Sequence, residues 1–295
     1  MCALNVFSRS VPTLIIDCHA ILHAVRHAQY HRGDLAVKDW SLIGGFINAI
    51  NSISYRFGSG NIVFAWDSSS SFRKDRYPFY KDRKSAKIQN EEEKEIDRHH
   101  FKQFAIIRDE IIPTIGFVHN HRYEGFEADD IIAATVMNNS RSMIIVSSDE
   151  DLYQLLDYAP MYIYRKKALF SAQAFRIAYG IEPKDWWKVK AVAGCSSDCV
   201  PGVPGIGETY AIRYLKGELK GARLEKIINN KAKIDENEWL VKLPLQVDPP
   251  CPIPDLNYEE GPRSMNGFIS VITKYDVHGF TPDRLENIAS RWRLK

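Results

Sequence analysis

Aspartates follow three short apolar segments of this sequence, an arrangement that suits cation binding. The segments and their aspartates are residues 14–16 with Asp17, residues 62–66 with Asp67, and residues 143–146 with Asp149 and Asp151. If the segments are parallel strands of a doubly wound sheet, functional groups gather just beyond their carboxyl ends. Two carboxylates about 4 Å apart repel by roughly 4 kcal/mol at an effective dielectric constant of about 20, so a cluster of them needs a cation.

The type of ligand indicates which cation and which chemistry. Carboxylate oxygens favour Mg²⁺ or Mn²⁺ over Zn²⁺. Two divalent ions are the expected occupants of so many carboxylates. Such a pair activates water and stabilises the leaving oxygen in phosphodiester cleavage.

A fourth acidic group opens an apolar run that has helical character. It contains Glu127, Asp129 and Asp130, followed by residues 131–136. Glu127 and Asp130 are three apart and share a face of the first helical turn. Acidic residues at a helix start also cap free N–H groups and complement the macrodipole, so capping is an equal alternative for this group. Capping does not explain three apolar segments that end in aspartate.

The three apolar segments predict the fold class. Each is short, partly β-branched and without the alternation of a half-exposed strand, which is typical of buried parallel strands. The intervening stretches are long enough for crossover helices, and residues 40–56 carry apolar side chains near helical spacing. The sequence predicts an α/β fold with a central, mostly parallel sheet flanked by helices.

A basic segment interrupts this pattern and is expected to project from the body. Seven basic and two acidic residues lie between Arg73 and Lys87, within a polar stretch at about 68–100. This segment is a candidate for phosphate contacts, with a solvated charged face as the alternative. Farther on, the PGVPGIG turn at 201–207 precedes an expected helix at 208–215, where glycines allow close approach of a phosphate to a helix N-terminus.

Composition excludes several classes of protein. The chain has 295 residues, 45% of them hydrophobic, and a net charge of +2. It lacks a membrane-length apolar run and a signal peptide, so a cytoplasmic location is expected. The five cysteines show no CxxC pair, which argues against a disulfide framework or a structural zinc site.

Three motifs together carry a resemblance to a known family. They are GFEADD at 125–130, SSDED at 147–151 and SSDCVPGVPGIGE at 196–208. With them, residues 12–245 resemble the 5′ nuclease family, which includes bacteriophage flap endonucleases and the nuclease domain of bacterial DNA polymerase I. The resemblance implies a PIN-like nuclease core at 12–184, with a helical arch at about 68–100. It also implies a helix-three-turn-helix DNA-binding region and a C-terminal tail at 185–295.

The resemblance implies two metal sites, each for Mg²⁺ with Mn²⁺ as a substitute. The first ion is expected on Asp67, Glu127 and Asp129, with Asp17 and the catalytic-site residue Asp130 in support. The second is expected on Asp149, Asp151 and Asp198. A K⁺ ion is implied at the helix-three-turn-helix.

The resemblance also implies DNA contacts. Lys81 and Arg83 are expected to hold the scissile phosphate as catalytic residues, although alignment at Arg83 needs a one-residue gap. Tyr80 is expected to stack on a base, and Arg73 belongs to a motif shared with the family. A solvated side chain is the alternative for each. The duplex backbone is expected to be gripped by the glycine turn, through Gly202, Gly205 and Gly207.

One position departs from the family pattern and leaves the function with alternatives. Cys195 stands where the family has aspartate, and Cys199 replaces an asparagine. A thiol is a poor ligand for Mg²⁺, so we expect a weakened or rearranged second site rather than half of a zinc site. The favoured function is a monomeric nuclease cutting DNA at 5′ flaps or 5′ ends and leaving 5′-phosphate and 3′-hydroxyl groups. A catalytically weakened DNA-binding protein and an RNA-cleaving relative are the alternatives, and the balance of exonuclease and endonuclease action stays open.

Overall fold

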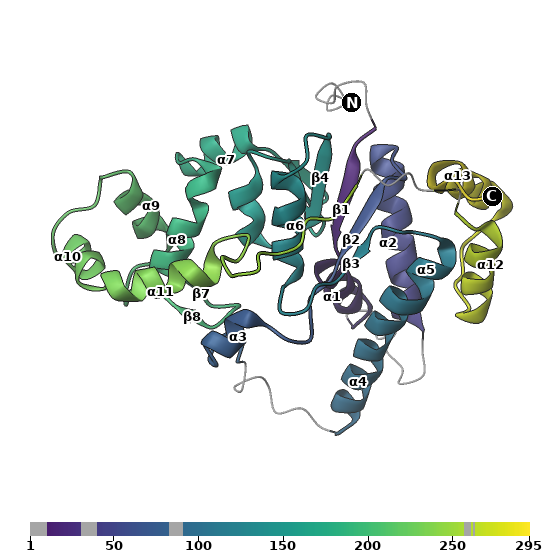
Figure 1. Cartoon of the computed structure of the whole chain (residues 1–295), viewed down its shortest axis with the longest axis horizontal. Coiled ribbons are helices and arrows are strands. Elements are labelled where there is room, and N and C mark those ends of the chain that lie inside the picture. The colour runs from purple at the N-terminus through teal and green to yellow at the C-terminus, as the bar shows by residue number, and fades with distance from the viewer. Residues whose placement is uncertain (1–10, 31–39, 83–90, 257–260, 262) are drawn as a thin grey trace.

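A six-stranded sheet lies at the centre of the part of the chain described by the computed structural model, which is residues 11–30, 40–82, 91–256, 261 and 263–295 (Figure 1). Its strands are β1 (Thr13–Asp17), β2 (Ile62–Ala65), β3 (Asn120–His121), β4 (Met143–Ser147), β5 (Met161–Ile163) and β6 (Ala168–Phe170). The order is β3-β2-β1-β4-β5-β6, and every pair is parallel except β5 with β6. The predicted α/β fold with a mostly parallel sheet is confirmed.

The strands lack alternation because both faces of the sheet are covered. Leu14, Ile16 and Phe64 face one apolar cluster, whereas Ile15 and Val63 face another. Successive side chains of a strand point to opposite faces, so each strand contributes to both clusters.

Helices cover the two faces separately. The first cluster packs against α1 (Cys18–Tyr30), α2 (Ser41–Phe57), α4 (Glu91–Ile106), the π-helical turn η1 (Ile107–Ile111), α5 (Ile112–Ile115), α12 (Met265–Lys274) and α13 (Pro282–Trp292). The second packs against α6 (Ala128–Met137), the 3-10 turn η2 (Glu150–Leu155), α7 (Ala172–Tyr179), α8 (Trp186–Ala193), α9 (Glu208–Leu215), α10 (Ala222–Asn229) and α11 (Lys231–Val241). The 3-10 turn η3 (Pro183–Asp185) precedes α8. No helix in the described ranges is long and apolar enough to cross a membrane.

The region expected at 185–295 occupies two separate places. Helices α9, α10 and α11 lie at one end of the molecule, and α12 and α13 lie at the other, against α5 and α2 (Figure 1). The irregular segment at 242–256, which contains several prolines, runs between them. The C-terminal helices therefore pack on α5 and α2 rather than on α9–α11, and the predicted domain boundary at 184/185 stays a prediction.

The predicted projecting segment is partly described. It contains α3 (Phe72–Arg76) near the start and α4 at the end, and α4 extends away from the sheet (Figure 1). Residues 83–90 lie outside the described residues, and so does the predicted catalytic Arg83. The arch that these helices would complete remains an expectation.

Candidate active site

Three aspartates meet at the carboxyl edge of the sheet, because β2, β1 and β4 are neighbours. Asp17 is the last residue of β1, Asp67 lies two residues after the end of β2, and Asp149 lies two residues after the end of β4. The N–H of Ala128, the first residue of α6, donates to Oδ1 of Asp67 at 2.8 Å. This bond brings the acidic group at the start of α6 to the same edge.

Asp17 is the most enclosed of these three aspartates, at 5% exposed. Its Oδ2 accepts from the Ser147 hydroxyl at 2.6 Å, and its Oδ1 accepts from the N–H of Ala20 at 2.9 Å. Burial, followed by the charges of Asp67 and Asp149, raises the pKa of Asp17 to about 7 despite these bonds. A cation at this edge would favour the ionised form.

Asp129 faces the same concentration of negative charge. Burial raises the pKa of Asp129 well above its ordinary value, and the charges of Asp149 and Asp17 raise it further. For Asp67 burial acts in the same direction, but His19, Lys81 and the N–H of Ala128 outweigh it and lower the pKa. His19 accepts the backbone N–H of Asp67 at 3.2 Å through Nδ1, which orients the chain just beyond β2, and burial lowers the pKa of His19.

Lys81 joins the two predicted metal groups. Its Nζ lies 3.0 Å from Oε2 of Glu127 and 3.9 Å from Oδ1 of Asp198. Its backbone N–H donates to the carbonyl of Asp198 at 2.8 Å. Burial acts to lower the pKa of Lys81, but the charge of Glu127 and other neighbours holds it well above its ordinary value. The structure therefore places a charged amine between carboxylates of the two groups.

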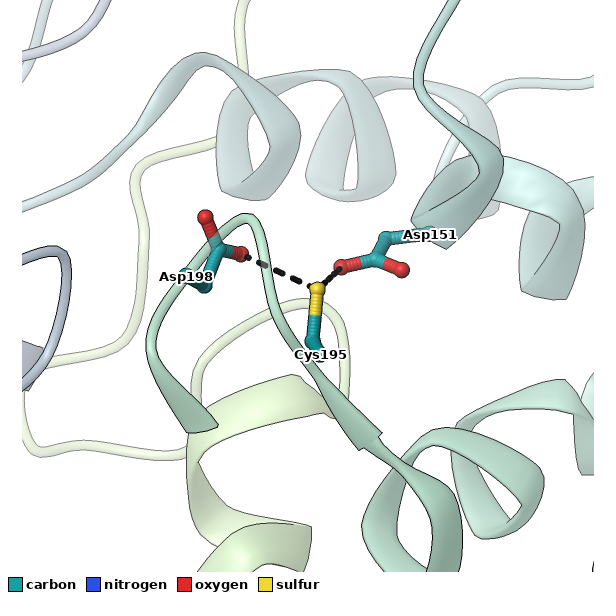
Figure 2. A group of neighbouring side chains, drawn as sticks. All are labelled: Asp151, Cys195 and Asp198. Carbon is teal, nitrogen blue, oxygen red and sulfur yellow. Dashed lines mark hydrogen bonds between the residues drawn. The ribbon is translucent and has the colours of Figure 1, made fainter. Parts of the chain in front are cut away.

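A thiol lies beside two carboxylates of the second predicted metal group. Ligand atoms of Asp151, Cys195 and Asp198 lie within 4.8 Å of one another (Figure 2). The Cys195 Sγ donates to Oδ2 of Asp151 at 3.6 Å and lies 3.8 Å from Oδ2 of Asp198. Burial and these two carboxylates raise the pKa of Cys195 to about 12. Burial, then the charge of Asp149, raises the pKa of Asp151 to about 7.

Comparison with known proteins assigns the chain to a family. The model of the family described as "5′-3′ exonuclease, N-terminal resolvase-like domain" matches residues 12–180. The chain belongs to this family. Its members are hydrolytic nucleases.

Individual relatives agree with this assignment. The chain is 29% identical over 234 residues to a 5′-3′ exonuclease from Buchnera aphidicola (Schizaphis graminum strain), covering 77% of each protein. It is 27% identical over 215 residues to the 5′-3′ exonuclease of Bacillus subtilis, covering 69% of each. It is 24% identical to DNA polymerase I of Thermus thermophilus, but the match spans only 26% of that polymerase.

Solved structures confirm the predicted fold. T5 5′-exonuclease with bound zinc superposes with a TM-score of 0.67 at 20% identity, covering 79% of this chain and 90% of that one. Flap endonuclease-1 from Methanococcus jannaschii superposes with a TM-score of 0.54 at 14% identity, covering 96% and 92%.

Two residues assigned to this exonuclease-family site from the sequence hold each other instead. Arg73 and Asp130 are 2% and 0% exposed, and the guanidinium donates to both Asp130 oxygens, at 2.6 and 2.9 Å. Arg73 also donates from Nε to the carbonyl of Leu240 at 2.8 Å. Asp130 accepts the N–H groups of Glu127 and Leu245, at 3.1 and 2.8 Å. Both side chains are buried in this structure, and Asp130 forms a capping box with Glu127 at the start of α6, as the capping alternative expects.

Tyr80 also differs from its predicted role. Its ring is 3% exposed, in an apolar cluster with Cys195 and Leu240. Its hydroxyl donates to Oε2 of Glu127 at 3.0 Å. In this structure Tyr80 is not available to stack on a base and instead orients the carboxylate that Lys81 contacts.

The glycine turn of this exonuclease-family member joins α8 to α9. A Cβ on Gly202 would lie 2.0 Å from the carbonyl oxygen of Ala193, so only glycine fits there. Gly205 has a φ of +75°, a conformation that favours glycine. Gly207 caps α9 in open space, where a Cβ would meet nothing within 4 Å. Close packing explains Gly202 and the left-handed backbone explains Gly205, whereas neither reason applies to Gly207.

Lys190 is a site residue that was not predicted from the sequence. Its Nζ lies 3.4 Å from Oδ1 of Asp151 and 3.0 Å from Oε1 of Glu208, and its side chain is 9% exposed. Lys190 lies four residues after the buried Trp186 in α8, a spacing at which an apolar residue is expected on the inner face. A lysine at such a position is the signal of a buried partner, and it links the second metal group to the helix after the glycine turn.

Proposed function

We propose that the chain is a divalent-metal-dependent nuclease that hydrolyses phosphodiesters of DNA at 5′ flaps or 5′ ends. The products are 5′-phosphate and 3′-hydroxyl groups. The observation that carries the proposal is the meeting of carboxylates from β1, β2, β4, α6 and the turn after β7 (Gly194–Cys195) at one edge, with Lys81 between two of them. Related 5′-3′ exonucleases support the direction of cleavage.

The donor atoms fit two divalent ions. Asp67, Glu127 and Asp129 supply only oxygen for the first ion, which suits Mg²⁺ or Mn²⁺. Asp149, Asp151 and Asp198 are the carboxylates for the second. Asp17 supports both groups, because it touches Ser147 of β4 and raises the local negative charge. When bound, the ions supply an activated water and stabilise the leaving oxygen.

Lys81 is proposed to hold the scissile phosphate. Its amine is charged, since neighbouring carboxylates raise its pKa. Its backbone at φ +52° is fixed by the bond to the Asp198 carbonyl, so the side chain starts from a defined place beside the carboxylates. A fixed cation beside the reacting phosphate stabilises charge that develops in the transition state. Arg83 is proposed as a second contact on the same strand.

The turn between α8 and α9 is proposed to hold the duplex. The N-terminus of α9 presents free backbone N–H groups behind Gly207, a site suited to a phosphate. A K⁺ ion is proposed to accompany that phosphate. Lys190 links this turn to the proposed cleavage site, because its amine contacts both Glu208 at the start of α9 and Asp151.

Cleavage of a 5′-flap DNA labelled at its 5′ end tests the proposal. A matched 3′-flap and a single strand serve as substrate controls, each with Mg²⁺, Mn²⁺ or EDTA. We expect metal-dependent cutting near the base of the 5′ flap and none of the 3′ flap. Tight flap binding without cutting in either metal would contradict the proposal and support a DNA-binding protein of the same fold. An RNA flap cut faster than the DNA flap would contradict the substrate assignment.

A further inference from the structure

We propose that Asp151, Cys195 and Asp198 form a mixed carboxylate–thiolate site that binds a thiophilic divalent cation, Zn²⁺, Co²⁺ or Cd²⁺, in preference to Mg²⁺. The proposal refines the second metal site of the proposed function. It departs from an all-carboxylate site because the group nearest the centre of this cluster is sulfur (Figure 2).

The distances from the sulfur of Cys195 to the two carboxylates fit a tetrahedral ion. Zinc bonds sulfur at about 2.3 Å and carboxylate oxygen at about 2.0–2.2 Å, which places the two ligand atoms about 3.6 Å apart at a tetrahedral angle. The observed separations from Sγ of Cys195 are 3.6 Å to Asp151 and 3.8 Å to Asp198. Octahedral Mg²⁺, with bonds of about 2.1 Å, needs neighbouring ligands about 3.0 Å apart.

The backbone fixes two of these ligands relative to each other. Cys195 pairs with Val200 of β8 (Val200–Pro201), and the N–H of Asp198 donates to the Cys195 carbonyl at 3.2 Å, closing the turn between the strands. Gly194 holds this hairpin against the next segment, because a Cβ there would lie 2.4 Å from the nitrogen of Gly202. Sγ and the Asp198 carboxylate therefore face the same side of one tight turn.

The third ligand, Asp151, has one carboxylate oxygen that does not contact Lys190 and can bind the ion. Lys190 lies 3.4 Å from Oδ1 of Asp151, whereas the thiol faces Oδ2. A cation bound by the thiol and Oδ2 would leave the Lys190 contact in place. Asp151 can therefore form the salt bridge with one oxygen and bind a metal ion with the other.

An ion has a route to the cluster. A cavity of about 680 Å³ is lined by Asp149, Asp151, Lys190, Cys195 and Ser197. Cys195 is 6% exposed, so a bound ion would be largely shielded from water and would reach sulfur through this cavity. As the metal–sulfur bond forms, the thiol proton leaves to solvent, and neither oxidant nor reductant is needed.

Titration of the 295-residue chain with Co²⁺ tests the proposal, since a thiolate bound to Co²⁺ gives a near-ultraviolet charge-transfer absorption that carboxylates do not give. We expect a saturable band in the wild type, its loss in Cys195→Ser and Cys195→Asp, and its retention in Cys199→Ser. Zn²⁺ and Cd²⁺ should remove the band at lower concentrations than Mg²⁺. Calorimetry should show that Cys195→Asp raises the affinity for Mg²⁺ relative to Cd²⁺ by at least about tenfold, the size of effect that loss of a partner at a metal site causes.

Two results would overturn the proposal. One is calorimetric Co²⁺ binding to the wild type without the band, and the other is a band that persists in Cys195→Ser. Circular dichroism of each variant establishes that it is folded. Flap cleavage is scored separately: cleavage without the band contradicts only the thiolate site, whereas the band without cleavage in any metal supports the site and contradicts the proposed function.

Discussion

The ammonium of Lys81 lies 3.0 Å from Oε2 of Glu127, and the same carboxylate oxygen accepts the hydroxyl of Tyr80. Residues 80 and 81 come from the segment expected to form the arch, and Glu127 caps the start of α6. The contact therefore couples the proposed strand-binding segment to the proposed metal ligands. A substitution in the segment that contains Lys81 should therefore affect the position of Glu127, and the reverse.

Lys81→Ala is expected to slow flap cleavage by roughly 10²- to 10³-fold, the effect of removing one group that stabilises transition-state charge. Flap affinity should change far less, because the basic segment retains its other cations. Single-turnover cleavage and fluorescence anisotropy measure the two quantities. Lys74→Ala is the matched control, since Lys74 is exposed in the same segment. An equal loss in both variants would show that only local charge matters.

Asp130→Ala is expected to destabilise the fold by about 3–5 kcal/mol, because it leaves the buried Arg73 guanidinium without its partner. Urea unfolding at neutral pH measures this change. Asp157→Ala is the control: it removes a surface partner of Arg176, and an exposed ion pair contributes far less stability than a buried one. Replacing both buried residues, Arg73→Met with Asp130→Leu, should restore part of the loss. A change below about 1 kcal/mol in Asp130→Ala would refute the structural role.

Gly202→Ala and Gly207→Ala test whether each glycine of the turn is needed for close backbone packing. A Cβ at Gly202 would collide with the Ala193 carbonyl, so this variant should lose about 1–3 kcal/mol or more of stability. A Cβ at Gly207 meets no neighbour within 4 Å, so thermal unfolding of that variant should match the wild type. Equal melting temperatures for the two variants would contradict the close approach at Gly202.

His121 is expected to make the fold less stable in mild acid. Burial, followed by the neighbouring His119, lowers the pKa of His121 from 6.5 to about 4. Between these pH values the unfolded chain binds a proton at His121 that the folded chain does not bind. The free energy of unfolding therefore falls as the pH drops from 6.5 to about 4. Urea unfolding at pH 7 and pH 5 should show a smaller difference in His121→Gln than in the wild type. His278→Gln, at an exposed position, should keep the full difference, and an unchanged difference in His121→Gln would contradict this account.

The sequence predicted the fold well because the relevant signals are local. Apolar runs without alternation mark strands buried on both faces, and the aspartates that follow them need no knowledge of distant contacts. The helix at 40–56 was likewise correct to within a residue at each end, as α2 runs from Ser41 to Phe57, before Gly58 in the left-handed conformation.

The sequence failed where a side chain's role depends on a distant partner. In the sequence Arg73 is one of several cations in a basic segment. Only the fold shows that it forms a buried ion pair with Asp130, 57 residues away. The C-terminal helices return to the core through contacts such as Trp292 with Phe117, whose ring centroids are 5.3 Å apart. No periodicity within the tail specifies which surface it covers.

Asp129→Ala, compared with the wild type on a pre-bound 5′-flap DNA, tests the central claim most directly. Single-turnover cleavage is started by adding Mg²⁺ or Mn²⁺ to the complex, and Asp157→Ala serves as a charge-matched control. The expected result is metal-triggered cutting by the wild type and the control, and none by Asp129→Ala, with flap binding retained in all three. Cutting by Asp129→Ala at the wild-type rate would contradict the assignment of these carboxylates as the catalytic metal site.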